Sequence, residues 1–83
     1  MNRTQDRSGI YYSDEEGEVL AKILYVIKDD HLVIEHTIVS EKLKGQGLGK
    51  KLVDEVEEYA KKEGLKIQAT CPFAKAYLDK KQN

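Results

Sequence analysis

The spacing of apolar residues changes near residue 45, and this change limits the fold more than any other feature of the chain. Between Glu18 and Ser40 the apolar residues follow the two-residue repeat of β-strands. Between about Gly47 and Glu63 they recur every three or four residues, as on one face of a helix. The pattern predicts an α+β fold in which a helix covers a sheet.

Three segments with the strand pattern come first and are linked by short turns. They cover about residues 10–12, 18–28 and 31–40, and the middle one is largely apolar on both faces, as is typical of a central strand. Gly17 and the Asp29-Asp30 pair supply turn residues between them. These features predict an antiparallel three-strand meander.

Two shorter elements follow the helical segment. Gly64 is placed to end the helix as a left-handed cap. The strand pattern returns over residues 65–70, and Pro72 begins a short helix that reaches about Lys80. A strand after a crossover helix can lie parallel to the strand before it. The predicted order is therefore βββαβα, with the fourth strand parallel to the third.

Composition narrows the domain organisation and the class of partner. The 83 residues suffice for one domain, which we place at residues 9–83, after a flexible leader at residues 1–8. A net charge of −1 argues against nucleic-acid binding through phosphates, and no apolar run is long enough to span a membrane. The single cysteine indicates a reducing, cytoplasmic location, and with two distant histidines it makes no metal site. No feature demands more than a monomer or a weak homodimer.

The glycine-rich segment Lys44-Gly45-Gln46-Gly47-Leu48-Gly49 lies where the strand pattern gives way to the helix. Glycines allow backbone N–H groups to converge, and the helix N-terminus adds unpaired donors and partial positive charge. The segment is therefore a candidate site for a pyrophosphate or another anion, although glycines also serve simple turns. It lacks the Walker pattern. Glu63 ends the helix, whereas a dinucleotide-binding unit places its acid at the end of the following strand.

The stretch from Glu35 to Tyr77 resembles the acetyl-CoA-binding half of the GNAT acetyltransferase superfamily. The family pattern of Gln or Arg, two residues, Gly, one residue, and Gly or Ala maps onto Lys44 to Gly49, with Lys at the first position. Residues 36–39 and 71–73 resemble the H-T-x-V and C-x-F segments of its very small YjdJ-like branch. The resemblance implies a truncated GNAT-like fold, acetyl-CoA as cosubstrate, and transfer of its acetyl group to an amine acceptor that the sequence does not identify.

In GNAT proteins two neighbouring strands part, and the pantetheine arm of acetyl-CoA lies between them. The resemblance therefore implies that the strand before the glycine segment binds this arm. The glycine segment would bind the pyrophosphate, and the start of the last helix would lie near the thioester. The cofactor contacts implied in this way are Ile38, Val39, Ser40, Lys44, Gly45, Gln46, Gly47, Leu48, Gly49, Lys50, Thr70, Cys71, Phe73 and Lys75.

Four residues are candidates for the chemistry. Glu35, or else His36, is expected to take the proton of the amine; the plainer interpretations are a solvent-facing strand residue and a core histidine. Cys71 precedes Pro72 at a helix start, where a thiol pKa is lowered, so it is either an acetyl carrier or an inert buried thiol. Tyr77 is implied as the general acid, or it packs the last helix onto the sheet.

Two other functions stay open at this point. A non-catalytic module that senses or presents acetyl-CoA suits a chain with so little sequence outside the cofactor-binding half. A protein-interaction domain with a degenerate glycine loop would bind no cofactor. Acetylated product or free thiol distinguishes the enzyme from the first of these, and failure to bind acetyl-CoA identifies the second.

Overall fold

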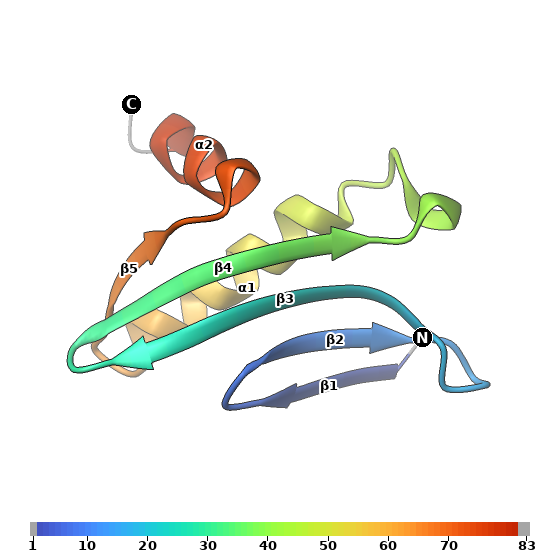
Figure 1. Ribbon diagram of the computed structural model, residues 1–83, viewed down its shortest axis with the longest axis horizontal. Helices are drawn as coiled ribbons and strands as arrows, with labels where there is room; N and C mark the ends of the chain where they lie inside the picture. Colours follow the sequence, from blue (N-terminus) through green and yellow to red (C-terminus); the bar gives the residue numbers. More distant parts are fainter. Residues whose placement is uncertain (1, 82–83) are drawn as a thin grey trace.

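Five strands lie in sequence order and form one sheet in the computed structural model, which describes residues 2–81 (Figure 1). Strands β1 to β4 are antiparallel to their neighbours, whereas β5 runs parallel to β4. The elements are β1 (Asn2–Asp6), β2 (Gly9–Ser13), β3 (Val19–Lys28), β4 (His31–Val39), the 3₁₀ turn η1 (Glu41–Leu43), α1 (Leu48–Lys62), β5 (Lys66–Ala69) and α2 (Pro72–Lys81).

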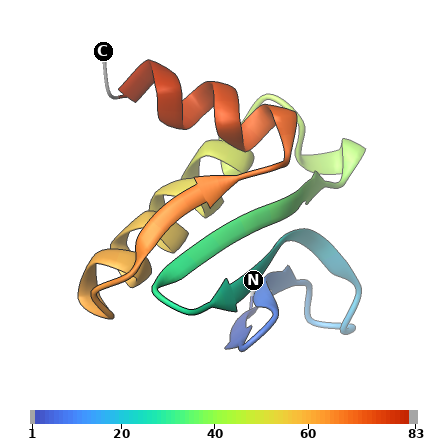
Figure 2. The ribbon, with the colours of Figure 1, turned by 60° about the vertical axis from the view of Figure 1, so that its left-hand side comes forward.

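The predicted meander, crossover helix, parallel strand and closing helix are confirmed as β2–β4, α1, β5 and α2. Gly17 and Gly64 take positive φ angles of 88° and 70°, as their predicted turn and cap roles require. In Figures 1 and 2, α1 covers one face of the sheet, and α2 lies beyond the end of β5. This arrangement brings the N-terminal ends of both helices to the same end of β4.

The structure adds a strand that the sequence pattern does not reveal. Residues 1–8 are expected to be an irregular leader, and this is wrong for Asn2–Asp6, which pair with β2 as β1. β1 is an edge strand whose residues are mostly exposed, so neither of its faces requires apolar side chains. Arg3 Nε donates to Glu55 of α1 at 2.7 Å and ties the strand to the helix. Met1 of the expected leader and residues 82–83 of the expected domain lie outside the described residues.

The core lies between the sheet and the apolar stripe of α1. Leu52 and Val56 of α1 are fully buried, and they pack in one cluster with the fully buried sheet residues Ile23, Leu32 and Ile34. Burying a side chain of this size contributes about 1.5–3 kcal/mol. The same cluster includes Cys71. Core packing therefore fixes the start of α2 relative to β4.

A β-bulge at Glu35 reverses which face of the sheet each side chain points to in the second half of β4. Ile34 lies opposite Tyr25, but His36 lies opposite Leu24, so Glu35 has no partner on β3. One extra residue reverses the alternation, and Thr37 now faces the helices while His36 faces outward. The expectation of a core histidine is wrong, because His36 is exposed.

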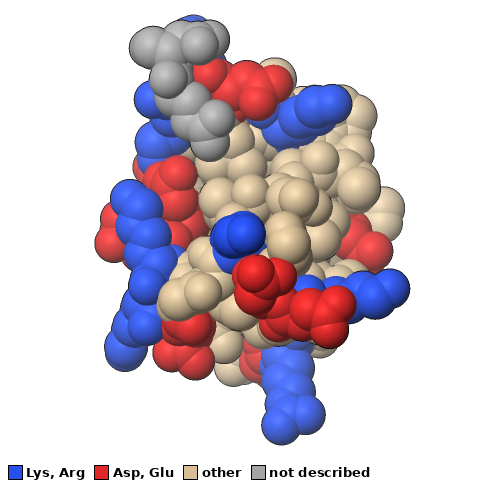
Figure 3. All heavy atoms as spheres, turned by 90° about the vertical axis from the view of Figure 1, so that its left-hand side faces the viewer, with Lys and Arg blue, Asp and Glu red and all other residues tan. Residues whose placement is uncertain are grey.

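Charged side chains are mixed on the end of the molecule drawn at the left of Figure 1. Figure 3 shows Lys and Arg side chains interspersed with Asp and Glu and with uncharged residues, so this face has no patch of a single sign. Neither helix in residues 2–81 has the length and apolar character that crossing a membrane requires.

Candidate functional site

The two parallel strands part at Ile34. Their ladder ends with the pair Ile34 and Ala69. The Ile34 carbonyl then accepts from the backbone N–H groups of Thr70 at 2.9 Å and Cys71 at 3.2 Å, and the chain turns into α2. Within the described residues, β4 continues along β3 with no strand on its other side (Figure 2). The split leaves a gap between the end of β4 and the start of α2.

Thr37 and Val39 direct their backbone polar groups into this gap. The N–H of Ser40 donates to the Leu20 carbonyl at 2.7 Å. Ser40 and Ile38 therefore direct their backbone N–H and C=O groups toward β3. Alternate residues of an antiparallel strand face away from the partner, which leaves the N–H and C=O groups of Thr37 and Val39 for a ligand. Ile38 and Ser40, both implied as cofactor contacts, line a separate hollow with the start of β3.

The glycine segment turns the chain into α1 through two left-handed residues. Gly45 has a φ of 84° and Gly47 a φ of 72°, which residues with a side chain rarely adopt. Gly47 caps α1, and the N–H of Lys51 donates to its carbonyl at 3.0 Å. The N–H groups of residues 48–50 therefore have no acceptor within the helix. Together with the helix dipole they could hold an anion at this end of α1.

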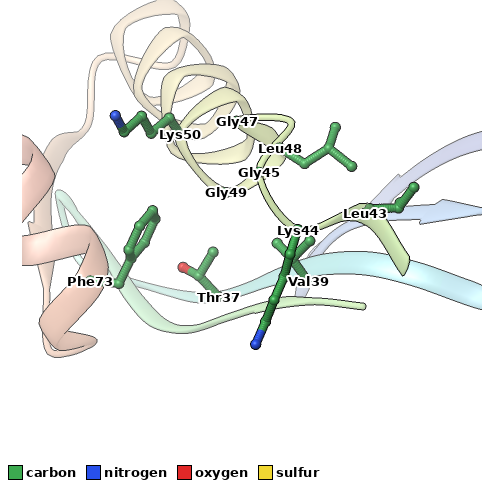
Figure 4. Close-up of a pocket in the computed structure, with 10 residues that line it drawn as sticks. All are labelled: Thr37, Val39, Leu43, Lys44, Gly45, Gly47, Leu48, Gly49, Lys50 and Phe73. Carbon is green, nitrogen blue, oxygen red and sulfur yellow. The ribbon is translucent and has the colours of Figure 1, made fainter. Parts of the chain in front are cut away.

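A cavity of about 370 Å³ lies between the glycine segment, the end of β4 and the start of α2 (Figure 4). The Phe73 ring closes one end and rests against α1, because a Cβ on Gly49 would lie 3.0 Å from Phe73 Cζ. Glycine at position 49 thus provides space for the ring. The lining residues are Thr37, Val39, Leu43, Lys44, Gly45, Gly47, Leu48, Gly49, Lys50 and Phe73.

Two lysines supply positive charge to the cavity. Lys44 Nζ lies 3.2 Å from a carboxylate oxygen of Glu41, an ion pair that partly neutralises its charge. Lys50 forms no ion pair with any residue between positions 2 and 81. Lys50 lies in the first turn of α1, where a cation is unfavourable next to the helix dipole. An anion in the cavity would offset that cost.

Cys71 lies at the N-terminus of α2 with its thiol beside β4. The N–H of Lys75 donates to the Cys71 carbonyl at 2.9 Å, so Cys71 is the cap residue and Pro72 the first residue of the helix. The residue is 8% exposed. Its Sγ lies 3.8 Å from the Thr37 hydroxyl oxygen, and Thr37 also lines the cavity. The inner end of the cavity therefore lies next to the thiol.

The pKa of the Cys71 thiol is lower than its ordinary value. Burial alone would raise this pKa, but hydrogen bonds to the sulfur outweigh that effect. They come from the backbone N–H of Ala74, the side chain of Thr37, and the backbone N–H groups of Phe73 and Thr37. Each of them stabilises the thiolate, which is the nucleophilic form of cysteine.

Six of the implied cofactor contacts do not line the cavity. Three are Ile38, Ser40 and Cys71, described above. Thr70 is exposed and bonds back to the Ile34 carbonyl, and Lys75 lines a separate hollow along β5. Gln46 is exposed on the loop but does not line the cavity.

The remaining catalytic candidates do not line the cavity, and Glu35 lines a separate hollow with residues of β2 and β3. Glu35 and His36 are exposed, at and just after the bulge where β4 and β5 part. The Tyr77 hydroxyl donates to the Asp54 carboxylate at 3.2 Å, and burial and this bond raise its pKa. Lys81 Nζ joins the same carboxylate at 2.6 Å, so this cluster ties α2 to α1. The role of Tyr77 as a general acid stays a prediction.

Thr37 and Leu43 line the cavity and were missed by the sequence reasoning. Thr37 belongs to the H-T-x-V segment that carries the resemblance, so a signal for it existed. The bulge conceals its position, because simple alternation from Leu32 places Thr37 on the face away from the helices. Leu43 ends η1 and carries no signal beyond its apolar character.

Comparison with known proteins gives a consistent result. The family described as GCN5-related N-acetyl-transferase matches residues 10–83. A Staphylococcus aureus protein, described provisionally as a GCN5-like N-acetyltransferase, is 43% identical and superposes with a TM-score of 0.80 over 98% of this chain and 80% of its own. An acetyltransferase from Bacillus cereus is 25% identical, with a TM-score of 0.67, and the match covers 80% of this chain and 52% of that one.

More distant structures share the fold alone. A ribosomal-protein-alanine N-acetyltransferase from Brucella melitensis has a TM-score of 0.70 at 17% identity, over 94% of this chain and 66% of its own. No curated protein matches the sequence. The assignment to a YjdJ-like branch stays a prediction. The family match over residues 10–83 and the 43% identical structure lead to one conclusion: the chain belongs to the GCN5-related N-acetyltransferase family.

Proposed function

We propose that the chain binds acetyl-CoA and transfers the acetyl group to an amine, with Cys71 as an intermediate carrier. One observation carries the proposal. The cavity extends from the N-terminus of α1 at Gly45 and Gly47 to Thr37, whose hydroxyl contacts the Cys71 thiol near the point where two parallel strands part. A cofactor with an anionic group, a long neutral arm and a reactive end would match, in that order, the N-terminus of α1, the cavity and the thiol.

The pyrophosphate would be held at the N-terminus of α1. The N–H groups of residues 48–50 lack helical acceptors, and the left-handed Gly45 and Gly47 let the loop backbone approach an anion closely. Lys50 would contribute its unpaired charge, and Lys44 could exchange Glu41 for a phosphate. These groups match the charge and the hydrogen-bonding capacity of a pyrophosphate.

The pantetheine arm would lie along the free edge of β4. Its amides would bond to the backbone groups of Thr37 and Val39, as an added strand does. The arm would pass the Phe73 ring and bring the thioester to the inner end of the cavity, beside Cys71. In this arrangement the backbone groups that bind the pantetheine arm belong to Thr37 and Val39 rather than to Ile38 and Ser40.

Cys71 would attack the thioester carbonyl as a thiolate. A bond forms between Cys71 Sγ and the acetyl carbon, and the bond from that carbon to the CoA sulfur breaks, which releases CoA as a thiolate that takes a proton from solvent. An acceptor amine then attacks the acetyl group on Cys71. The carbon–nitrogen bond forms, Cys71 leaves as a thiolate again, and the proton lost by the amine passes to a base.

Glu35 is our proposed base, with His36 as the alternative. Both side chains are exposed where the strands part, on the side from which an acceptor can approach. Exposure leaves each free to exchange its proton with solvent between turnovers. The acceptor itself would be an amine that reaches this open side of the sheet.

Incubation with acetyl-CoA, followed by intact-mass measurement, is expected to show one added acetyl group on the wild type. The Cys71→Ala variant should gain none, because the protein contains no other cysteine. Both proteins should bind acetyl-CoA in a parallel titration, since the alanine variant retains the glycine segment and β4.

The titration separates the competing outcomes. Binding without an adduct or any acetylated amine would support a non-catalytic acetyl-CoA module, and product without an adduct would support direct transfer from the thioester. Absence of binding would overturn the proposal as a whole.

Replacing Lys50 by alanine is expected to weaken acetyl-CoA binding by about three- to tenfold, because one unpaired cation next to a diphosphate is worth roughly 1 kcal/mol at a partly exposed site. The loss should shrink as salt is raised. Lys62→Ala is the control, because Lys62 is an exposed lysine at the opposite end of the same helix. Titration at low and high salt measures both effects, and equal losses for the two variants would contradict a local role.

A further inference from the structure

Cys71 has one hydroxyl partner among the described residues, and it comes from a different element of the fold. Thr37 Oγ1 lies 3.8 Å from Cys71 Sγ, although 34 positions separate the residues. In Figure 4 the Thr37 hydroxyl is directed toward the start of α2. Thr37 also lines the cavity, whereas Cys71 does not. Thr37 is therefore the contact between the proposed cofactor path and the thiol.

We infer that Thr37 is a positioning residue for Cys71: it holds the thiolate toward the cavity through two hydrogen bonds from one residue. This inference rests on the proposed function, because a held thiolate matters only if it attacks a ligand. In the thiolate state the Thr37 hydroxyl donates to Sγ, and in the thiol state Sγ–H can donate to the hydroxyl. The same contact therefore persists through both protonation states.

The backbone of Thr37 contributes the second bond. Its N–H faces the gap, because the β3 ladder uses the alternate residues, and it contributes to the lowered pKa of the Cys71 thiol. The bulge at Glu35 is what makes both contacts possible. Without the extra residue, the Thr37 side chain would face away from α1 and α2.

Hydrogen bonds lower the pKa of the thiol against the effect of burial. They come from Ala74, Thr37 and Phe73. Among the titratable side chains on the elements around the thiol, Glu35 and His36 of β4, Lys50 of α1, Lys66 of β5 and Lys75 of α2 are exposed. Asp54 of α1 and Tyr77 of α2 are half-buried and bond to each other. Loss of the hydroxyl should therefore be visible in the titration of the thiol.

The test is the rate of iodoacetamide alkylation as a function of pH in the absence of any ligand. The protein has one cysteine, so the midpoint of the rate profile reports the Cys71 pKa alone. Thr37→Val keeps the shape and removes the hydroxyl, and its midpoint should rise by about half a pH unit or more. Thr37→Ser keeps the hydroxyl and should stay close to the wild type. Thr37→Ala serves as a second hydroxyl-free variant should the valine variant not fold.

Thr70→Val is the matched control, because the Thr70 hydroxyl is also next to Cys71 but bonds to the Ile34 carbonyl. Its midpoint should not move. An unchanged midpoint in both hydroxyl-free variants of Thr37, or equal shifts in Thr37→Ser or Thr70→Val, overturns the inference. The readout is independent of acetyl-CoA. Failure of the proposed function would instead appear as a wild type that neither binds acetyl-CoA nor forms an adduct.

Discussion

Replacing Leu52 by alanine is expected to lower the free energy of unfolding by about 2–5 kcal/mol, because it leaves a cavity in the middle of the core. Leu52 has no exposed surface and packs between α1 and the sheet. The neighbouring side chains come from strands fixed by their ladders, so the site can collapse only in part. A domain of 83 residues has roughly 4–12 kcal/mol of stability in total. The variant should therefore lose a large share of it.

Urea unfolding followed by circular dichroism measures the change as a lower midpoint at similar slope. Ile38→Ala is the control: Ile38 is 49% exposed on the outer face, and its truncation should cost less than about 1 kcal/mol. Comparable losses at the two positions would contradict the assignment of the core to the α1 face of the sheet. Because Cys71 belongs to the same core cluster, the thiol of Leu52→Ala should also become easier to alkylate.

Elements with strong local signals could be predicted from the sequence alone. α1 carries an apolar stripe, it begins within the glycine segment, and Gly64 follows its last turn, so three independent features agree on its bounds. The anion-binding end of α1 follows from the same residues, because it depends on backbone geometry that glycine permits. The family resemblance depends on these residues as well.

Features that depend on pairing between strands could not be predicted. β1 has mostly exposed polar residues, and only its pairing with β2 and the contact of Arg3 with Glu55 make it a strand. The bulge at Glu35 has no local signature, yet it decides that Thr37 faces the cavity and His36 the solvent. His36, which alternation along β4 places on the core face, was therefore assigned to the wrong face.

The position of Cys71 shows how packing and chemistry are joined in this fold. Ala74 and Leu78 of α2 pack in the core. Tyr77 and Lys81 bond to Asp54 of α1, which ties α2 to that helix. These contacts place Cys71 beside Thr37 of β4. The lowered pKa of the thiol thus has a local part, from the N–H groups of Phe73 and Ala74 in the first turn of α2, and a part from Thr37 that depends on how α2 packs against β4.

Replacing Gly49 by valine is expected to weaken acetyl-CoA binding at least tenfold, which corresponds to about 1.4 kcal/mol or more. A Cβ at this position would lie 3.0 Å from the Phe73 ring and 3.8 Å from Val39 Cγ2. The two further methyl groups of valine would occupy the part of the cavity between β4 and the ring. Helix propensity does not oppose the change, because valine is at least as good as glycine in a helix. The fold should therefore persist while isothermal titration shows the loss.

Two further variants locate the cause of that loss. Lys61→Val places the same residue on an exposed part of α1 and should leave binding unchanged. Combining Gly49→Val with Phe73→Ala removes the ring that the new side chain meets. The double variant should regain part of the affinity, since the valine can then occupy the volume left by the ring instead of the cavity. Undiminished binding by Gly49→Val would contradict the placement of the cofactor in this cavity. A loss that Phe73→Ala does not relieve would mean that valine blocks the approach of the pyrophosphate to the α1 N-terminus, with no part played by the ring.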